Sequence, residues 1–141
     1  MTGRQRVLAA LERRETDRLP VDFAGTDCSS MHVISYHRLR RALGIELRPI
    51  RLACLMQQVV EADEEIQNWF GADAVPLYFY PRQWRVWESY GIPVEAPALW
   101  RPETLADGST GVRNSDGEVL SRRAAGGFYF DPAAFRLASV V

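Results

Sequence analysis

The residues whose types allow chemistry are few, and two of them lie close together. Cys28 and His32 are four residues apart, next to a stretch of small and polar residues. A thiolate and an imidazole can form one edge of a zinc site, but such a site needs further ligands and no third one is close. The other cysteine, Cys54, is distant and forms no CxxC pair. We therefore predict two free, buried thiols and no metal within this chain.

Three polar residues are candidate substrate contacts. Asp22 stands between Val21 and Phe23 in a short predicted strand, so its carboxylate points away from their apolar face. It can orient a substrate or form a structural ion pair. His32 begins a predicted helix beside a loop, where it can contact a substrate or serve as a capping or packing residue. Gln57 lies near the start of another predicted helix and can donate hydrogen bonds to a substrate.

The hydrophobic pattern predicts the elements that must position these side chains. Residues 55–70 have the spacing of a helix with one buried face, carried by Met56, Val59, Val60, Ile66 and Phe70. Gly71 follows, as is usual at the end of a helix. Residues 73–80 are apolar on both faces, which is typical of a strand covered on both sides. A helix, a glycine and a buried strand form one repeat of an α/β fold.

The flanking segments also have local signals. Thr2 and Gln5 are spaced as the two partners of a capping box, which predicts a first helix. Residues 19–23 read as a short strand, and residues 32–43 as a helix that ends at Gly44. Residues 81–102 contain three tryptophans and little periodicity, so we expect an irregular excursion. Residues 112–122 predict a hairpin around Asn114–Gly117, and residues 126–132 a further short strand.

Composition is that of a globular domain with no nucleic-acid or membrane partner. Of the 141 residues, 47% are hydrophobic and 25% are charged, and the net charge is −1. No basic excess is present to bind nucleic acid or anionic lipid. No apolar run approaches the ~20 residues of a membrane helix, and the charged, amphipathic start is no signal peptide. We expect a cytoplasmic protein.

Six segments follow one another in an order that points to a known family. They are residues 4–10 (RQRVLAA), 17–23 (DRLPVDF), 32–44, 70–75 (FGADAV), 116–119 (DGEV) and 126–131 (GGFYFD). This order resembles the N-terminal region of uroporphyrinogen decarboxylase-like proteins. The resemblance implies an incomplete N-terminal part of a (β/α)8 TIM barrel with a β-hairpin excursion. Residues 1–80 would hold helices and the first barrel strands, 81–132 the excursion, and 133–141 a divergent end.

The resemblance also suggests which branch of the family the chain belongs to. A closed barrel takes ~250 residues, so the resemblance implies the front part of a longer protein. In the decarboxylase of porphyrin biosynthesis, arginines hold the substrate carboxylates. The corresponding loop here, residues 25–32, has no arginine, and residues 78–80 lack the acid found in that enzyme. We therefore predict a cobalamin-dependent methyltransferase-like or unassigned branch, with the decarboxylase as the alternative.

Methyltransferases of this family use zinc to activate a thiol, through a His-x-Cys pair and a later cysteine in the C-terminal half. The resemblance thus implies zinc, a corrinoid protein partner and a small-molecule substrate for the full-length family member. It implies none of these cofactors within the present chain, which we expect to be inactive alone. A different alternative is a non-catalytic interaction module that self-associates or binds a missing C-terminal part. Its contact surface would be the hairpin and the tryptophan-rich excursion.

Overall fold

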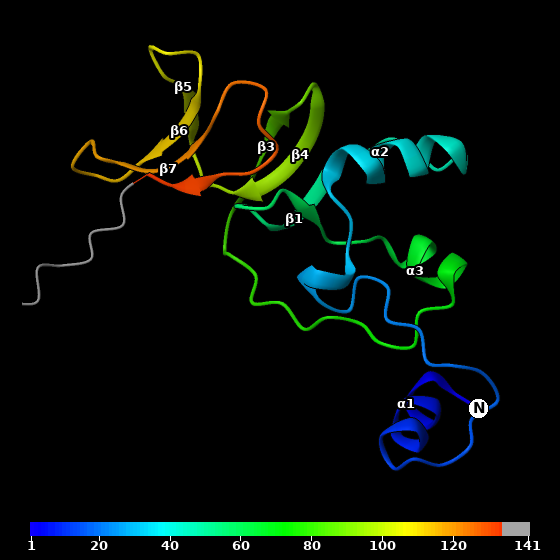
Figure 1. The fold of residues 1–141 in the computed structure, drawn as a ribbon. Coiled ribbons are helices and arrows are strands. Elements are labelled where there is room, and N and C mark those ends of the chain that lie inside the picture. Colours follow the sequence, from blue (N-terminus) through cyan, green and yellow to red (C-terminus); the bar gives the residue numbers. More distant parts are fainter. Residues whose placement is uncertain (134–141) are drawn as a thin grey trace, which may run out of the picture.

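The fold, seen in a computed structural model that describes residues 1–133, is a small α+β domain (Figure 1). Its helices are α1 (Gly3–Leu11), α2 (Val33–Ala42) and α3 (Glu64–Phe70), and a 3-10 turn, η1 (Asp27–Ser29), precedes α2. The first sheet, of order β2-β1-β4-β3, contains β1 (Ile50–Cys54), β2 (Val59–Val60), β3 (Trp84–Ser89) and β4 (Ile92–Pro97). The second, of order β5-β6-β7-β8, contains β5 (Pro102–Thr104), β6 (Thr110–Arg113), β7 (Val119–Arg123) and β8 (Asp131–Pro132).

The prediction of an N-terminal part of a (β/α)8 barrel is wrong. Within residues 1–133 the strands form two small sheets that do not close, and every strand pair except β1 with β4 is antiparallel. The first sheet combines strands from both sides of residue 80, where the resemblance divides the chain. The α/β prediction depended on one helix–glycine–strand repeat, and neither the full helix nor the strand forms. The divergent end, from residue 134 onward, lies outside the described residues.

The predicted helix of residues 55–70 forms only in its second half. β1 and β2 pair antiparallel across a turn at residues 55–58, and α3 begins at Glu64. Gln58 has a φ of 54°, a left-handed conformation that interrupts a right-handed helix. Val59 and Val60 are β-branched residues that fit the short strand β2. The helical spacing of Val59 and Val60 from Ile66 is accidental, because these residues belong to two different elements. Gly71, with a φ of 64°, does end α3 as predicted.

The predicted buried strand at residues 73–80 belongs to neither sheet. Its side chains at Val75, Leu77 and Phe79 are 73%, 93% and 101% exposed. The composition is that of a strand, but no strand of the described chain lies beside it to supply hydrogen bonds. The predicted strand at residues 19–23 is also absent, and the Val21 carbonyl instead accepts a single hydrogen bond from the Asp73 N–H at 2.8 Å.

The segment expected to be irregular contains a regular hairpin. β3 and β4 pair over their whole length, from Trp84 with Pro97 to Ser89 with Ile92. The two residues between the strands, Tyr90 and Gly91, have φ values of 55° and 72°. Positive φ at both positions is the type I′ geometry that matches the twist of paired strands. The turn escaped prediction because its first residue is a tyrosine, whereas asparagine or aspartate usually marks it.

Elements with strong local signals are confirmed. The Thr2 hydroxyl accepts a hydrogen bond from the Gln5 N–H at 3.2 Å, and the Gln5 side chain accepts one from the Thr2 N–H at 2.9 Å. α2 begins directly after His32 and is followed by Gly44 with a φ of 69°. The hairpin of β6 and β7 forms around the predicted turn, in which Gly117 has a φ of 83°.

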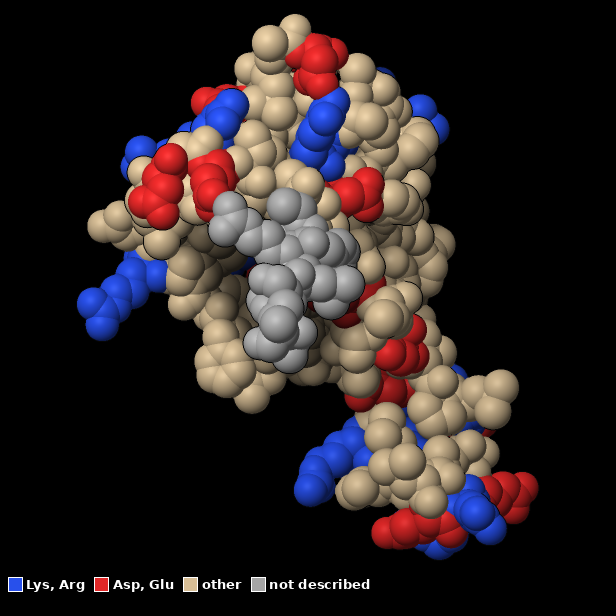
Figure 2. All heavy atoms as spheres, turned by 60° about the vertical axis from the view of Figure 1, so that its left-hand side comes forward, with Lys and Arg blue, Asp and Glu red and all other residues tan. Residues whose placement is uncertain are grey.

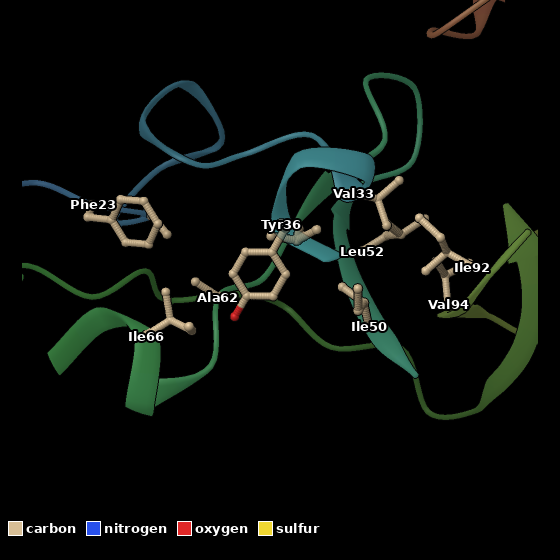
Figure 3. Packing of buried hydrophobic residues seen from close by; sticks show 11 residues of the cluster. Phe23, Val33, Tyr36, Ile50, Leu52, Ala62, Ile66, Ile92 and Val94 are labelled. Atoms are coloured by element: carbon tan, nitrogen blue, oxygen red, sulfur yellow. The ribbon is translucent and has the colours of Figure 1, made fainter. Parts of the chain in front are cut away.

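The hydrophobic core lies between the first sheet and helices α2 and α3 (Figure 3). Alternate residues of β1 and β4 point into it, as the period-two geometry of strands requires. Its labelled members include Phe23, Val33, Tyr36, Ile50, Leu52, Ala62, Ile66, Ile92 and Val94. None of the helices within residues 1–133 is both long and apolar enough to cross a membrane.

Truncating the core at α3 tests this packing. Ile66 is fully buried, so Ile66→Ala should lower the free energy of unfolding by about 2–5 kcal/mol through lost apolar contact and a residual cavity. Urea titration followed by circular dichroism measures the change. The matched control, Val86→Ala, removes an apolar side chain that is 59% exposed and should change stability by about 0.5 kcal/mol or less. Equal effects for both variants would contradict the assigned core.

Candidate functional site

A cavity of about 690 Å³ lies where the loop before α2, the turn after β1 and the segment around β8 meet. Two of the three predicted substrate contacts, His32 and Gln57, line this cavity, as does Cys28. These residues come from two separate loops, which the fold brings together because the N-terminus of α2 pairs with β2. The isolated bridge between His32 and Val59 and the hydrogen bond from the Val33 N–H to the Gln58 carbonyl make this junction.

His32 is held by contacts on both ring nitrogens. Nδ1 accepts a hydrogen bond from the Ile34 N–H at 3.3 Å and so caps α2. Nε2 lies 3.2 Å from the carbonyl oxygen of Phe128, which assigns the proton to Nε2. The rings of Tyr90, Phe128 and Tyr129 surround the imidazole at centroid distances of 5.4 to 5.9 Å. The capping and packing roles considered for His32 are thus both present.

The surroundings of His32 also set its protonation. Burial lowers its pKa below the ordinary 6.5, and the nearby positive charge of Arg123 lowers it further. The hydrogen bond to the Phe128 carbonyl, which favours the protonated ring, offsets part of this decrease. The imidazole is therefore neutral at pH 7. With both nitrogens engaged by the backbone, it has no free position from which to transfer a proton.

The other two predicted contacts differ in position. Gln57 is exposed at the cavity and makes no hydrogen bond within the described chain, so its amide is available to a ligand. Asp22 lies outside the lining. Its carboxylate accepts hydrogen bonds from the Gly25 N–H at 2.9 Å and the Ser29 hydroxyl at 3.0 Å, and so holds its own loop together. Of the two roles considered for Asp22, a structural one is therefore present, through hydrogen bonds within its own loop.

The cysteines are free, as predicted, but neither is fully buried. Cys28 is exposed on η1, and Cys54, at the end of β1, is partly buried. The Cys28 thiol is therefore exposed beside the cavity that it lines. Within residues 1–133 no group of three or more His, Cys, Asp or Glu side chains is arranged to hold a metal ion. Cys28 and His32 share a cavity, but His32 is engaged elsewhere and cannot activate the thiol.

A buried polar chain behind the cavity was missed by sequence reasoning. The Gln58 side chain is fully buried; its Nε2 donates to the Leu55 carbonyl at 2.6 Å, and its Oε1 accepts from the Ser89 hydroxyl at 2.7 Å. The Ser89 Oγ accepts in turn from Arg123 at 3.2 Å. The Arg123 guanidinium lies 4.3 Å from the centroid of the Tyr90 ring and 5.1 Å from that of Phe130. This chain links the first sheet, through Ser89 of β3, to the second sheet, through Arg123 of β7.

A second candidate feature is the segment of residues 74–80, the long connection from α3 to β3 (Figure 1). Exposed Val75, Leu77 and Phe79 alternate with the part-buried Pro76 and Tyr78. This is the period-two pattern of an extended chain. Within residues 1–133, none of the backbone N–H or carbonyl groups of residues 74–80 forms a hydrogen bond. The segment therefore offers both apolar side chains and unpaired backbone to solvent.

Both ends of this segment are fixed. At its start the side chain of Asp73, only 3% exposed, forms ion pairs with Arg6 and Arg18 and accepts a hydrogen bond from the Val21 N–H at 2.9 Å. Burial alone would raise the pKa of Asp73, but these hydrogen bonds and the two positive charges hold it below the ordinary 3.8. At its end the Tyr80 hydroxyl donates to Glu61 at 2.8 Å.

The inward side of the segment is also anchored. Tyr78 lines a small cavity of about 100 Å³ beside Leu52 and Trp84, where its hydroxyl is buried without a hydrogen-bond partner among the described residues. Burial raises the pKa of Tyr78 to about 12, with a smaller contribution from the negative charges of Asp27 and Glu61. The hydroxyl is therefore uncharged at every ordinary pH. Because Pro76 and Tyr78 are part-buried, the alternate side chains of Val75, Leu77 and Phe79 point outward.

A comparison of the chain with known protein families, curated proteins and solved structures finds no match. The resemblance to uroporphyrinogen decarboxylase-like proteins therefore stays a prediction from the order of the sequence segments.

Removing the central hydroxyl tests the buried polar chain. Ser89→Ala takes away the partner of the buried Gln58 Oε1 and of Arg123, and an unsatisfied buried acceptor costs about 1–3 kcal/mol. Urea titration should show a loss of this size. Ser115→Ala, at an exposed turn, is the control and should have almost no effect. A neutral Ser89→Ala would show that the chain does not stabilise the fold.

The lowered pKa of His32 gives a second test. Because the folded protein binds this proton more weakly than the unfolded chain, stability should fall as the pH decreases through about 6.5 and below. Titration of the ring proton signals by nuclear magnetic resonance should give a His32 midpoint below 6.5, and His32→Gln should remove its signal for assignment. A midpoint at or above 6.5 would contradict the buried, backbone-bonded ring.

Proposed function

We propose that this chain is a non-catalytic interaction module, which binds an extended strand of another polypeptide along residues 74–80. The observation that supports this proposal is the exposure of Val75, Leu77 and Phe79 on a segment whose backbone makes no hydrogen bonds within the described chain. An unpaired edge of this kind is a template for strand addition, in which backbone hydrogen bonds give affinity and alternate side chains give specificity. This places the contact surface before the hairpin and tryptophan-rich segment considered from sequence.

The apolar side chains of the segment add to what its unpaired backbone can contribute to binding. Phe79, Leu77 and Val75 are separated by single residues, so they project on the same side and form one continuous apolar strip. Burial of this strip by a partner supplies the hydrophobic contribution to binding, at about 25 cal/mol per Å² of apolar surface. The fixed ends at Asp73 and Tyr80 mean that little conformational entropy is lost on binding.

The charge distribution is compatible with an apolar partner strand. Residues 74–81 contain no charged side chain. On the face shown in Figure 2, positive and negative side chains are interspersed without a large area of one sign. The surface therefore provides no long-range attraction for a highly charged partner such as nucleic acid. Recognition would depend on short-range contacts with the apolar strip.

The cavity at His32 supports a second candidate, the binding of a small molecule. Its volume of about 690 Å³ lies in the range of ligand pockets, and Gln57 is available in its wall. The decarboxylase and methyltransferase activities implied by the resemblance would need reacting groups beyond those described. His32 lacks a free nitrogen, and Cys28 lacks an activating partner in this part of the chain. Binding is therefore better supported than catalysis.

Hydrogen exchange with a peptide probe tests strand addition. A synthetic eight-residue peptide of alternating valine and threonine should slow exchange of the backbone amides of Val75, Leu77 and Phe79, because pairing gives them carbonyl partners. The control is the same peptide N-methylated at alternate positions on its pairing edge, which cannot complete the ladder and should give no protection. Unchanged exchange at all three amides with millimolar unmethylated peptide would refute the proposal.

A further inference from the structure

We propose that the strand bound along residues 74–80 is the same segment of a second copy of this chain. The two segments run antiparallel about a two-fold axis through Leu77. This inference rests on the proposed function and gives it a specific partner. A contact between identical surfaces is the commonest way in which soluble chains form dimers, and it requires the surface to be complementary to itself.

The outward side chains meet this requirement. In the proposed register Leu77 faces Leu77 of the second copy, and Val75 faces Phe79 in both directions. Every facing pair is then apolar, and a β-branched residue lies opposite an aromatic one, which is a favourable cross-strand pair. A shift of the register by one residue would place these exposed side chains opposite the inward residues Pro76 and Tyr78. The alternation therefore excludes a one-residue shift, and only the register centred on Leu77 pairs all three outward side chains with one another.

The backbone of the segment is also complementary to itself, on one edge only. In an extended chain the N–H and carbonyl of alternate residues point to opposite edges. Val75, Leu77 and Phe79 all present an N–H and a carbonyl on one edge, so each facing pair can exchange two hydrogen bonds. Pro76 has no N–H, but it belongs to the other edge and does not interfere. The edge with a complete set of donors is thus the edge used in the symmetric pair.

Charge favours a second copy over a charged partner. The segment itself is uncharged, and the whole chain has a net charge of −1, so two copies approach without strong repulsion. Because the strip is narrow, we expect a reversible dimer with an interface below the ~1,600 Å² of a standard stable complex. Such a dimer forms and dissociates with concentration, and its weight-average mass changes accordingly.

Sedimentation equilibrium of residues 1–141, over about 1–300 µM to cover weak interfaces, tests the dimer. Wild type should approach twice the monomer mass. Leu77→Arg places two like charges directly opposite each other and should leave a monomer. Leu120→Arg, at a site that is 53% exposed on β7, is the matched control and should dimerise as wild type does. Circular dichroism confirms that each variant is folded.

A charge exchange tests the direction of the strands. Val75→Glu and Phe79→Arg should each abolish the dimer, and the double variant should restore it. Antiparallel pairing brings the introduced carboxylate of each copy opposite the introduced guanidinium of the other, so opposite charges meet at both ends of the strip. Parallel pairing would place like charges opposite each other and give no rescue. Failure of the double variant to dimerise would overturn the register.

The outcomes separate the two proposals. A wild-type monomer at all concentrations, with amides of residues 75–79 still protected by the valine–threonine peptide, would overturn the dimer and leave strand addition in place. A monomer without peptide protection would overturn both. A wild-type dimer that persists in Leu77→Arg would show that the copies meet through another surface, and would also overturn this inference.

Discussion

The arrangement of the two sheets depends on one buried amide. Gln58 lies in the turn between β1 and β2 with a left-handed backbone. Its side-chain oxygen accepts a hydrogen bond from the Ser89 hydroxyl of the β3–β4 hairpin. Arg123 of β7 donates to the same hydroxyl and stacks on Tyr90. One polar chain thus connects three hairpins, of which β1–β2 and β3–β4 also share the apolar core. Since a partly satisfied buried network costs more than an apolar one, loss of any member would destabilise the contact between these hairpins.

Arginine has a similar connecting role elsewhere in the fold. All 17 basic residues are arginine, which by itself reflects composition. In the structure, however, Arg6 pairs with Asp17 and Asp73 at once and so attaches α1. Arg40, with its side chain 1% exposed, donates to the Arg48 carbonyl at 3.2 Å and pairs with Asp63. A planar guanidinium has several donors and can bind two or three acceptors from different segments at once, whereas a lysine ammonium has a single charged centre.

Short-range signals predicted part of the fold. The capping box of Thr2 and Gln5, the helix after His32 and the turn ending at Gly117 each depend on neighbours in sequence, and each is confirmed. The errors concern elements whose identity depends on distant partners. Val59 and Val60 form a strand because β1 lies beside them. Residues 73–80 stay outside both sheets because no strand of the described chain lies beside them.

The candidate site shows the same limit. His32 and Gln57 could be selected by residue type, and the fold brings them to one cavity. Sequence could not show that both His32 nitrogens are occupied by backbone groups, since Phe128 is far away along the chain. Asp22 was selected for its place in a strand that does not form. Gln58 carried no signal that distinguished it from Gln57, although one is fully buried and the other exposed.

Pro76 has a consequence for the size of any assembly. A strand with two usable edges can add copies without limit, which is how fibrils grow. Here the far edge of the segment lacks one donor at Pro76, and the neighbouring Tyr78 is held against the body of the domain. Growth would therefore stop after one addition. In the proposed pairing, this proline within an exposed, aromatic sequence would act as a gatekeeper against the growth of fibrils.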